Sequence, residues 1–291
     1  MGRLTSLRLA SFFSTRLQDR LPGRQLFGRT VRVSLFRSLV RTIHLAGYFV
    51  VYGTELLVKR PSTREARADW LHRFAASTLH GLGVQLEVDG DFPSFGAVIS
   101  NHLSYLDIIV FAALHPCIFV SKAEVASYPV LGWMTTMAGT VYVARGQGGS
   151  AMKAREGMQA ALNAGLPVVF FPEGTTSDGS GLLKFHSGLL AQVRADGAQV
   201  TAGHICYSIG PENGQDVKVS EQICYWGDMT LLPHIIRFLG LQDVRAKVRF
   251  ASEPIEFSGD ATHRKKAAKE AWVAVAELAE VATGIEEVHR F

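Results

Sequence analysis

From Gly83 onward, short β-rich runs alternate with longer runs of helical periodicity, and this alternation restricts the possible folds more than any other feature. Strands are predicted at 84–88, 97–100, 117–121, 140–143, 168–171, 200–207 and 244–250. Helices are predicted between them at 103–114, 149–164, 187–195 and 229–239. Such alternation is typical of a sheet with helices on both faces. We therefore predict an α/β fold with a mainly parallel or mixed central sheet flanked by helices.

The pattern divides the 291 residues into four segments. Residues 1–29 form a basic arm that we expect to be poorly ordered. Residues 30–82 are expected to form N-terminal membrane-associating helices, the second at 64–82. Residues 83–258 form the α/β domain, and 259–291 a C-terminal helix packed on it. The chain has only three cysteines, which is typical of a protein in a reducing compartment. They have no CxxC spacing, so no zinc site is predicted.

The whole chain has a net charge of +4, and its basic residues are concentrated near the N-terminus. Asp19 is the only acidic residue among the first 50, whereas the basic residues there are Arg3, Arg8, Arg16, Arg20, Arg24, Arg29, Arg32, Arg37 and Arg41. Such a segment can bind anionic lipid headgroups or nucleic acid. We favour lipid and expect no nucleic-acid partner, because an uncharged, aromatic run follows at 42–54.

That run has 13 residues, fewer than the roughly 20 needed to span a bilayer. No small-residue cleavage site follows it, so a signal peptide is not expected. An interfacial helix with an aromatic belt and basic flanks fits better, and residues 1–58 are predicted to bind membrane lipids. Two alternatives remain, an ordinary core helix after a disordered tail and a transit peptide over 1–29.

A histidine and an aspartate lie where the strand at 97–100 gives way to a helix, in the sequence NHLSYLD at 101–107. With His102 in the turn, the Asp107 carboxylate can reach back to one imidazole nitrogen. The carboxylate then fixes the tautomer and makes the other nitrogen more basic, as in a general base with its orienting group. Ser104 is a candidate helix cap. The ordinary alternative gives both residues capping or core roles.

A polar loop follows the strand at 168–171 and reads PEGTTSDG. Ligands bind at strand ends of this kind in open α/β sheets. Gly174 lets a ligand approach the backbone, and neighbouring hydroxyl and N–H groups suit phosphate oxygens. A hydrophilic turn before a helix is the alternative.

Two basic residues end other strands of the predicted sheet. Arg145 follows the strand at 140–143 and can grip a phosphate with two hydrogen bonds, while Lys122 follows the strand at 117–121 and can meet an anionic donor. An exposed Arg beside a flexible loop and a solvated Lys are the ordinary alternatives.

Together these blocks are far more specific than any one of them. His102-x4-Asp107, then 139–145 ending in Arg145, then FPEGT at 171–175 resemble, in order and separation, the glycerophospholipid acyltransferase superfamily. The resemblance is closest to bacterial 1-acyl-glycerol-3-phosphate (lysophosphatidic acid) acyltransferases. It covers about residues 35–255 and extends to Asn101, Lys122 and the segment YWGD at 225–228.

The resemblance implies an acyltransferase αβ fold and transfer of an acyl chain from acyl-CoA or acyl carrier protein to a lysolipid hydroxyl. His102 would deprotonate the hydroxyl, and Asp107 would orient the imidazole of His102. The reaction would need no acyl-enzyme, cofactor or metal. Glu173, Gly174 and Thr175 would shape the acceptor site, and Arg145 would bind its phosphate. We expect a monotopic or peripheral protein on the cytoplasmic face of the inner membrane.

Two departures leave the acceptor open. The family's third block usually reads FPEGTRS, and Thr176 occupies the position of that Arg. The fourth block usually has a Pro after its strand, and 200–203 has none. The Thr variant also resembles lyso-ornithine lipid acyltransferases. A serine hydrolase is disfavoured because the chain has no GxSxG elbow. A non-catalytic lipid-binding or tethering protein remains a rival, but it would not need the His–Asp pair.

Overall fold

The computed structural model describes residues 34–128, 131–144, 150–214, 216–260 and 262–283. Val33–Phe291 form one compact unit. The basic arm at 1–29 and Arg145 lie outside the described residues, so the expectations for them stay predictions.

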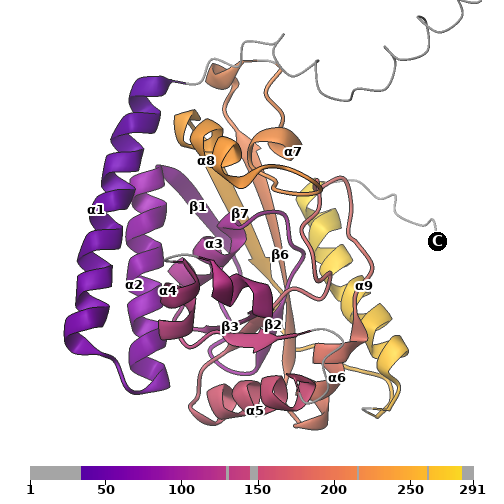
Figure 1. Ribbon diagram of the computed structural model, residues 1–291. Coiled ribbons are helices and arrows are strands. Elements are labelled where there is room, and N and C mark those ends of the chain that lie inside the picture. The colour runs from indigo at the N-terminus through magenta and orange to yellow at the C-terminus, as the bar shows by residue number, and fades with distance from the viewer. Residues whose placement is uncertain (1–33, 129–130, 145–149, 215, 261, 284–291) are drawn as a thin grey trace, which may run out of the picture. The chain divides into compact units, whose positions relative to one another are not determined.

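In the described part of the chain, seven strands form one sheet in the order β1-β7-β6-β2-β5-β3-β4 (Figure 1). The strands are β1 (Val84–Asp89), β2 (Ala97–Ile99), β3 (Ile118–Lys122), β4 (Val141–Val143), β5 (Val168–Phe170), β6 (Val200–Ile209) and β7 (Val244–Phe250). All neighbours run parallel except β6 and β7, which are antiparallel. The predicted mixed α/β fold is confirmed.

The central strands β2 and β5 are apolar because helices cover both faces. Their successive side chains alternate between two cores, as the two-residue period of a strand requires. Val98 and Val169 face the core that α2 (Arg64–Leu82), α3 (Leu106–Leu114) and α8 (Leu231–Gly240) share. Ile99 and Phe170 face the core under α5 (Ser150–Asn163), α6 (Ser187–Ala195) and α9 (Arg264–Thr283).

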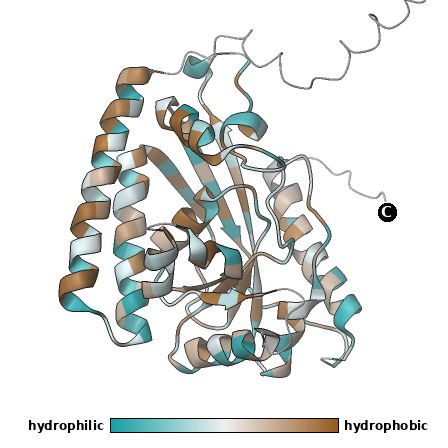
Figure 2. Ribbon diagram, in the orientation of Figure 1, coloured by the Kyte–Doolittle hydropathy of each residue, from teal (hydrophilic) through white to brown (hydrophobic). Residues whose placement is uncertain are grey.

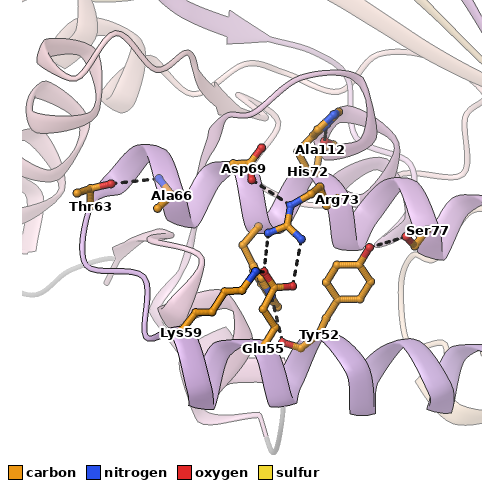
Figure 3. Close-up of polar contacts among 11 residues, drawn as sticks. Tyr52, Glu55, Lys59, Thr63, Ala66, Asp69, His72, Arg73, Ser77 and Ala112 are labelled. Carbon is orange, nitrogen blue, oxygen red and sulfur yellow. Dashed lines mark hydrogen bonds and ion pairs between the residues drawn. The ribbon is translucent and has the colours of Figure 1, made fainter.

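The N-terminal helices α1 (Leu35–Lys59) and α2 lie side by side, joined by polar contacts (Figure 3). Ser34 caps α1 and Thr63 caps α2, each accepting a backbone N–H three residues on. Glu55 accepts two bonds from Arg73, at 3.0 and 2.8 Å. These bonds hold the pKa of the Glu55 carboxyl at about 2.

The aromatic residues of the run expected as an aromatic belt, Tyr48, Phe49 and Tyr52, pack instead against α2. Phe49 meets Phe74 edge-on at 5.3 Å, and Tyr52 meets Phe74 at 5.5 Å. Trp70 stacks on the same Phe74 ring. They form a small core beside the sheet.

The opposite side of α1 is apolar and exposed. Figure 2 shows that many residues of this helix are hydrophobic. Its side chains are 58–78% exposed, namely Leu35, Phe36, Leu39, Ile43, Val50, Val51, Leu57 and Val58. Among the described residues, none of the helices combines the length and hydropathy needed to cross a membrane.

Arg37 and Arg41, the two of the nine N-terminal arginines that lie within the described residues, bind the protein itself. Arg41 is only 9% exposed and donates to the carbonyl oxygens of Leu239 and Leu241 at 3.1 and 2.5 Å. Arg37 donates to the carbonyl oxygen of Gly240 at 2.8 Å. They satisfy the C-terminal carbonyls of α8, where positive charge also complements the helix dipole. These two guanidinium groups therefore hold α1 against α8.

Several short elements were not expected from the sequence. They are the 3₁₀ helices η1 (Ala123–Ser127) and η2 (Pro211–Asn213) and the short helices α4 (Leu131–Met137) and α7 (Val219–Gln222). Helix α3 also begins at Leu106 rather than at 103, because the preceding residues form the turn that carries His102.

Candidate active site

The polar blocks converge because strands β2 and β5 are parallel neighbours, so the loops after them leave the sheet at the same edge. The two loops bond directly, since the Ser177 backbone N–H donates to the His102 carbonyl oxygen at 2.9 Å. Tyr225 N–H donates to the Leu103 carbonyl oxygen at 2.8 Å. Three segments distant in sequence thus fix the turn at His102.

The imidazole and carboxylate predicted to pair are in contact. His102 Nδ1 lies 2.8 Å from Asp107 Oδ2, and the Asp107 side chain is fully buried. With a carboxylate as acceptor, Nδ1 carries the hydrogen and Nε2 has the free lone pair. The geometry is that of a base with its orienting group.

Asp107 also organises the turn in which His102 lies. Its Oδ2 accepts the backbone N–H groups of Leu103 and Ser104 at 2.6 and 3.0 Å. The predicted Ser104 cap is therefore wrong, because Asp107 binds the turn instead and the buried Ser104 hydroxyl has no partner among the described residues. Three donors on one oxygen satisfy the fully buried carboxylate and hold it in place.

The other carboxylate oxygen of Asp107 has a partner that the sequence reasoning missed. Tyr207 Oη on β6 donates to Asp107 Oδ1 at 2.6 Å. The pKa of the Tyr207 phenol lies well above its usual value, chiefly through burial and then through the Asp107 charge, so the hydroxyl stays a donor. The sequence signal for this contact was a tyrosine that shares one face of a strand with Ile205 and Ile209.

Two further contacts position the imidazole. Its ring stacks on Phe171, with centroids 4.0 Å apart and planes within 5°. The preceding Asn101 is bound to the backbone of Ile205 twice, through its side-chain N–H₂ at 2.9 Å and its oxygen at 2.8 Å. The His102 side chain remains 16% exposed, and no described residue hydrogen-bonds Nε2.

Glu173 lies beneath this turn, 2% exposed. Its two oxygens accept the backbone N–H groups of His102 and Leu183, both at 2.8 Å. Burial raises the pKa of Glu173 to about 7, against the effect of the two N–H donors, and the Asp107 charge adds to the rise. In this structure the carboxyl joins the two catalytic loops. Its expected contact with the acceptor stays a prediction.

The other predicted binding residues lie around the same edge. Gly174 has a φ of 65°, a conformation that glycine adopts without strain, and Thr175 is exposed beside it. Thr176 is half-buried. Lys122 is exposed at the end of β3. Their roles toward a ligand stay predictions, and among the described residues no three His, Cys, Asp or Glu side chains group as a metal site.

An aromatic cluster, also not expected from the sequence, flanks the turn. Tyr105 Oη lies 3.2 Å from Nδ1 of His234, a fully buried residue of α8. Tyr225 meets both rings edge-on. His234 Nε2 donates to the Cys224 carbonyl oxygen at 3.0 Å, which leaves Nδ1 as acceptor for the tyrosine. Helix α8 is thereby connected to the catalytic turn.

The chain is similar in sequence to known acyltransferases. The family profile described as Acyltransferase matches residues 94–203, which include both catalytic candidates and the loop after β5. The lyso-ornithine lipid O-acyltransferase of Pseudomonas aeruginosa is 34% identical over 58% of this chain and 62% of its own length. This chain thus spans less than two thirds of that relative. The 1-acyl-sn-glycerol-3-phosphate acyltransferase of Neisseria meningitidis is 33% identical over 60% of this chain and 70% of its own length.

The fold has a solved counterpart. The crystal structure of the lysophosphatidic acid (LPA) acyltransferase PlsC from Thermotoga maritima superposes with a TM-score of 0.62. It covers 88% of this chain and 99% of its own, at 18% sequence identity, and so supports the fold alone. On the curated relatives and the matching profile, the chain belongs to the glycerophospholipid acyltransferase family.

Proposed function

We propose that the protein transfers a fatty acyl chain from acyl-CoA or acyl carrier protein to the free hydroxyl of a lysolipid. The observation that supports this most is the His102–Asp107 pair, with Nδ1 bound at 2.8 Å and Nε2 left for a substrate. Glycerophospholipid acyltransferases perform transfers of this class, and binding alone would not need such a pair.

The proposed reaction is a direct transfer. His102 Nε2 takes the proton from the acceptor hydroxyl as its oxygen attacks the thioester carbonyl carbon. The Asp107 carboxylate stabilises the imidazolium that forms. Collapse of the tetrahedral intermediate breaks the C–S bond, and the imidazolium returns its proton to the departing thiolate. The products are the acylated lipid and the free thiol, and the histidine is regenerated without an acyl-enzyme.

Lysophosphatidic acid is the acceptor that we propose first, with phosphatidic acid as the product. Lys122 ends β3, and Arg145 follows β4 by two residues in the sequence; as the family resemblance implies, their charges would suit a phosphate monoester. The Neisseria relative carries the corresponding name. Gly174 and Thr175 would line the acceptor side of the site.

Lyso-ornithine lipid is the second candidate acceptor. Thr176 stands where the family's third block usually has an arginine, so one phosphate-binding charge is missing. The Pseudomonas relative bears that acceptor in its name. An acceptor without a phosphate group would not need the second charge.

We also propose that the exposed apolar side of α1 contacts a membrane surface, because the lysolipid is supplied from one. Its side chains Phe36, Leu39 and Ile43 are 78%, 58% and 60% exposed. At about 25 cal/mol per Å², burying such side chains in a bilayer interface is favourable. The expected location is the cytoplasmic face of the inner membrane, where acyl-CoA and acyl carrier protein are available.

The experiment offers the purified protein labelled acyl-CoA or acyl carrier protein with a panel of lysolipids, and identifies products by mass spectrometry. His102→Ala should lower turnover by about 10²–10⁴ while the protein stays folded. His263→Ala is the matched control, because His263 pairs with Asp260 at 3.0 Å on the exposed surface. Normal turnover in folded His102→Ala protein would refute the mechanism. A product from lyso-ornithine lipid alone would select the second acceptor.

A further inference from the structure

A groove of about 530 Å³ separates the N-terminal half of α1 from the C-terminal end of α2. Residues of both helices line it: Arg37, Val40, Arg41, His44, Tyr48, His80, Gly81 and Gly83. None of the residues assigned above to catalysis or acceptor binding is among them.

Two glycines form the floor of the groove. A Cβ at Gly83 would lie 2.6 Å from Arg41 Nη2, and a Cβ at Gly81 would lie 2.6 Å from the Tyr48 ring. Gly83 also has a φ of 64°, where a side chain would be strained. The depth of the groove and the positions of the Arg41 and Tyr48 side chains therefore depend on glycine at both places.

The groove carries positive charge without a matching carboxylate. Its lining includes two arginines and two histidines and no acidic residue. Among the described residues, neither Arg37 nor Arg41 pairs with a carboxylate, and Arg41 Nη1 makes all of that side chain's bonds to α8. Burial, and then the charge of Arg37, lower the pKa of Arg41 to about 10. The C-terminus of α8 supplies only about half a negative charge against two guanidinium groups.

We propose that this groove binds the phosphate group of an anionic membrane lipid. A phosphate would compensate the buried Arg41 charge and accept hydrogen bonds from Nε and Nη2, which make no bond to a described residue. Val40 and Tyr48 add apolar wall, and Phe36, Leu39 and Ile43 continue the apolar surface along the same helix. A free phosphate would gain nothing from these side chains.

The choice of a lipid rests on the membrane contact proposed above, whereas the anion site itself rests on the groove alone. Neither depends on acyl transfer. The probe is therefore dihexanoyl phosphatidylmethanol below its critical micelle concentration, an anionic phosphodiester without a hydroxyl to acylate. Binding to the full chain is measured by titration calorimetry, and acyl transfer to a soluble acceptor is measured in parallel.

Arg37→Gln should weaken binding of the probe about tenfold or more, because it removes one of the two guanidinium charges that line the groove. Arg60→Gln is the matched control, because Arg60 is exposed at the far end of α1 and changes the net charge equally. Gly81→Ala keeps every charge, suits a helix, and should also weaken binding by displacing the Tyr48 ring. All three variants should retain acyl transfer.

Dihexanoyl phosphatidylcholine and inorganic phosphate test the two parts of the proposal. Both should bind at least tenfold more weakly than phosphatidylmethanol. Equal binding of the zwitterionic lipid, or unchanged binding in Arg37→Gln and Gly81→Ala, would overturn the anion site. Equal binding of inorganic phosphate would overturn the lipid assignment. A loss of acyl transfer together with probe binding would place the probe in the active site and overturn a separate groove.

Discussion

Removing the hydroxyl of Tyr207 tests how much its hydrogen bond to Asp107 Oδ1 contributes to stability and to catalysis. Tyr207→Phe deletes one oxygen atom and leaves Asp107 Oδ1 with no donor among the described residues, in place of the present 2.6 Å bond. A hydrogen bond to a charged group contributes about 1.5–3 kcal/mol. We expect the free energy of unfolding to fall by about 2 kcal/mol, and the melting temperature by several degrees.

The catalytic consequence is separable from that loss of stability. Without the Tyr207 donor, the Asp107 charge is less dispersed and holds the imidazolium of His102 more tightly. The base is then protonated to higher pH, so the acid limb of the kcat/KM profile should move upward. The KM for the acyl donor should change little, because Tyr207 is nearly buried behind the carboxylate.

The assay is the pH dependence of acyl transfer below the temperature at which the variant unfolds. Tyr52→Phe serves as the control, because it removes a hydroxyl bonded at 2.7 Å to Ser77 between α1 and α2. That control should lose stability without any movement of the profile. If Tyr207→Phe shows the same, the tyrosine is structural and its positioning role is refuted.

Three further predictions concern stability and membrane contact. The pKa of Glu173 is raised to about 7, so the folded state binds more protons than the unfolded state between pH 4.5 and 7. The contribution of Glu173 to the free energy of unfolding therefore falls as the pH rises through this range, by up to about 3 kcal/mol. Burial and the charge of Arg249 lower the pKa of His204 to about 4, so the contribution of His204 to the free energy of unfolding rises from pH 4 to 6.5. In urea unfolding, the free energy of unfolding should therefore rise with pH in Glu173→Gln, where only the His204 effect remains, and fall with pH in His204→Gln, where only the Glu173 effect remains. Gly132→Ala should cost about 1–3 kcal/mol in thermal unfolding, because its Cβ would meet a backbone carbonyl of η1 far inside van der Waals contact, whereas Gly188→Ala, with open space at its Cβ, should be neutral or stabilising. Ile43→Asp should reduce sedimentation with anionic vesicles at unchanged turnover on a soluble acceptor, and undiminished sedimentation would place the membrane contact elsewhere.

Elements with strong local signals were predictable from the sequence. Helix α2 covers the expected 64–82 because Thr63 caps its start and Gly83 ends it in the left-handed conformation. Strand β7 covers the expected 244–250. Helix α4 was missed because its seven residues make only about two turns, too few for a clear apolar periodicity. Its place depends on the tight packing of Gly132 against η1.

The predictable part of the site was local, and the rest depends on tertiary contacts. Asp107 follows His102 by five positions, so one turn brings them together. Tyr207 lies 100 residues from Asp107 and meets it only because β6 runs beside β2. The inward direction of Glu173 was also beyond sequence reasoning, since its two N–H partners belong to segments on either side of it.

The two arginines that join α1 to α8 make the helix that we propose to contact the membrane part of the domain's own stability. Deleting α1 would leave three C-terminal carbonyls of α8 without their present donors and uncover Phe74, so a truncation would damage the fold together with the anchor. Because α1 is joined to the domain, lipid binding by α1 should in turn stabilise the folded domain. A bilayer that binds only the docked helix stabilises the native state by RT ln(1 + [L]/Kd), where [L] is the accessible lipid. Resistance to heat and proteolysis should therefore depend on the lipid surface available to the protein.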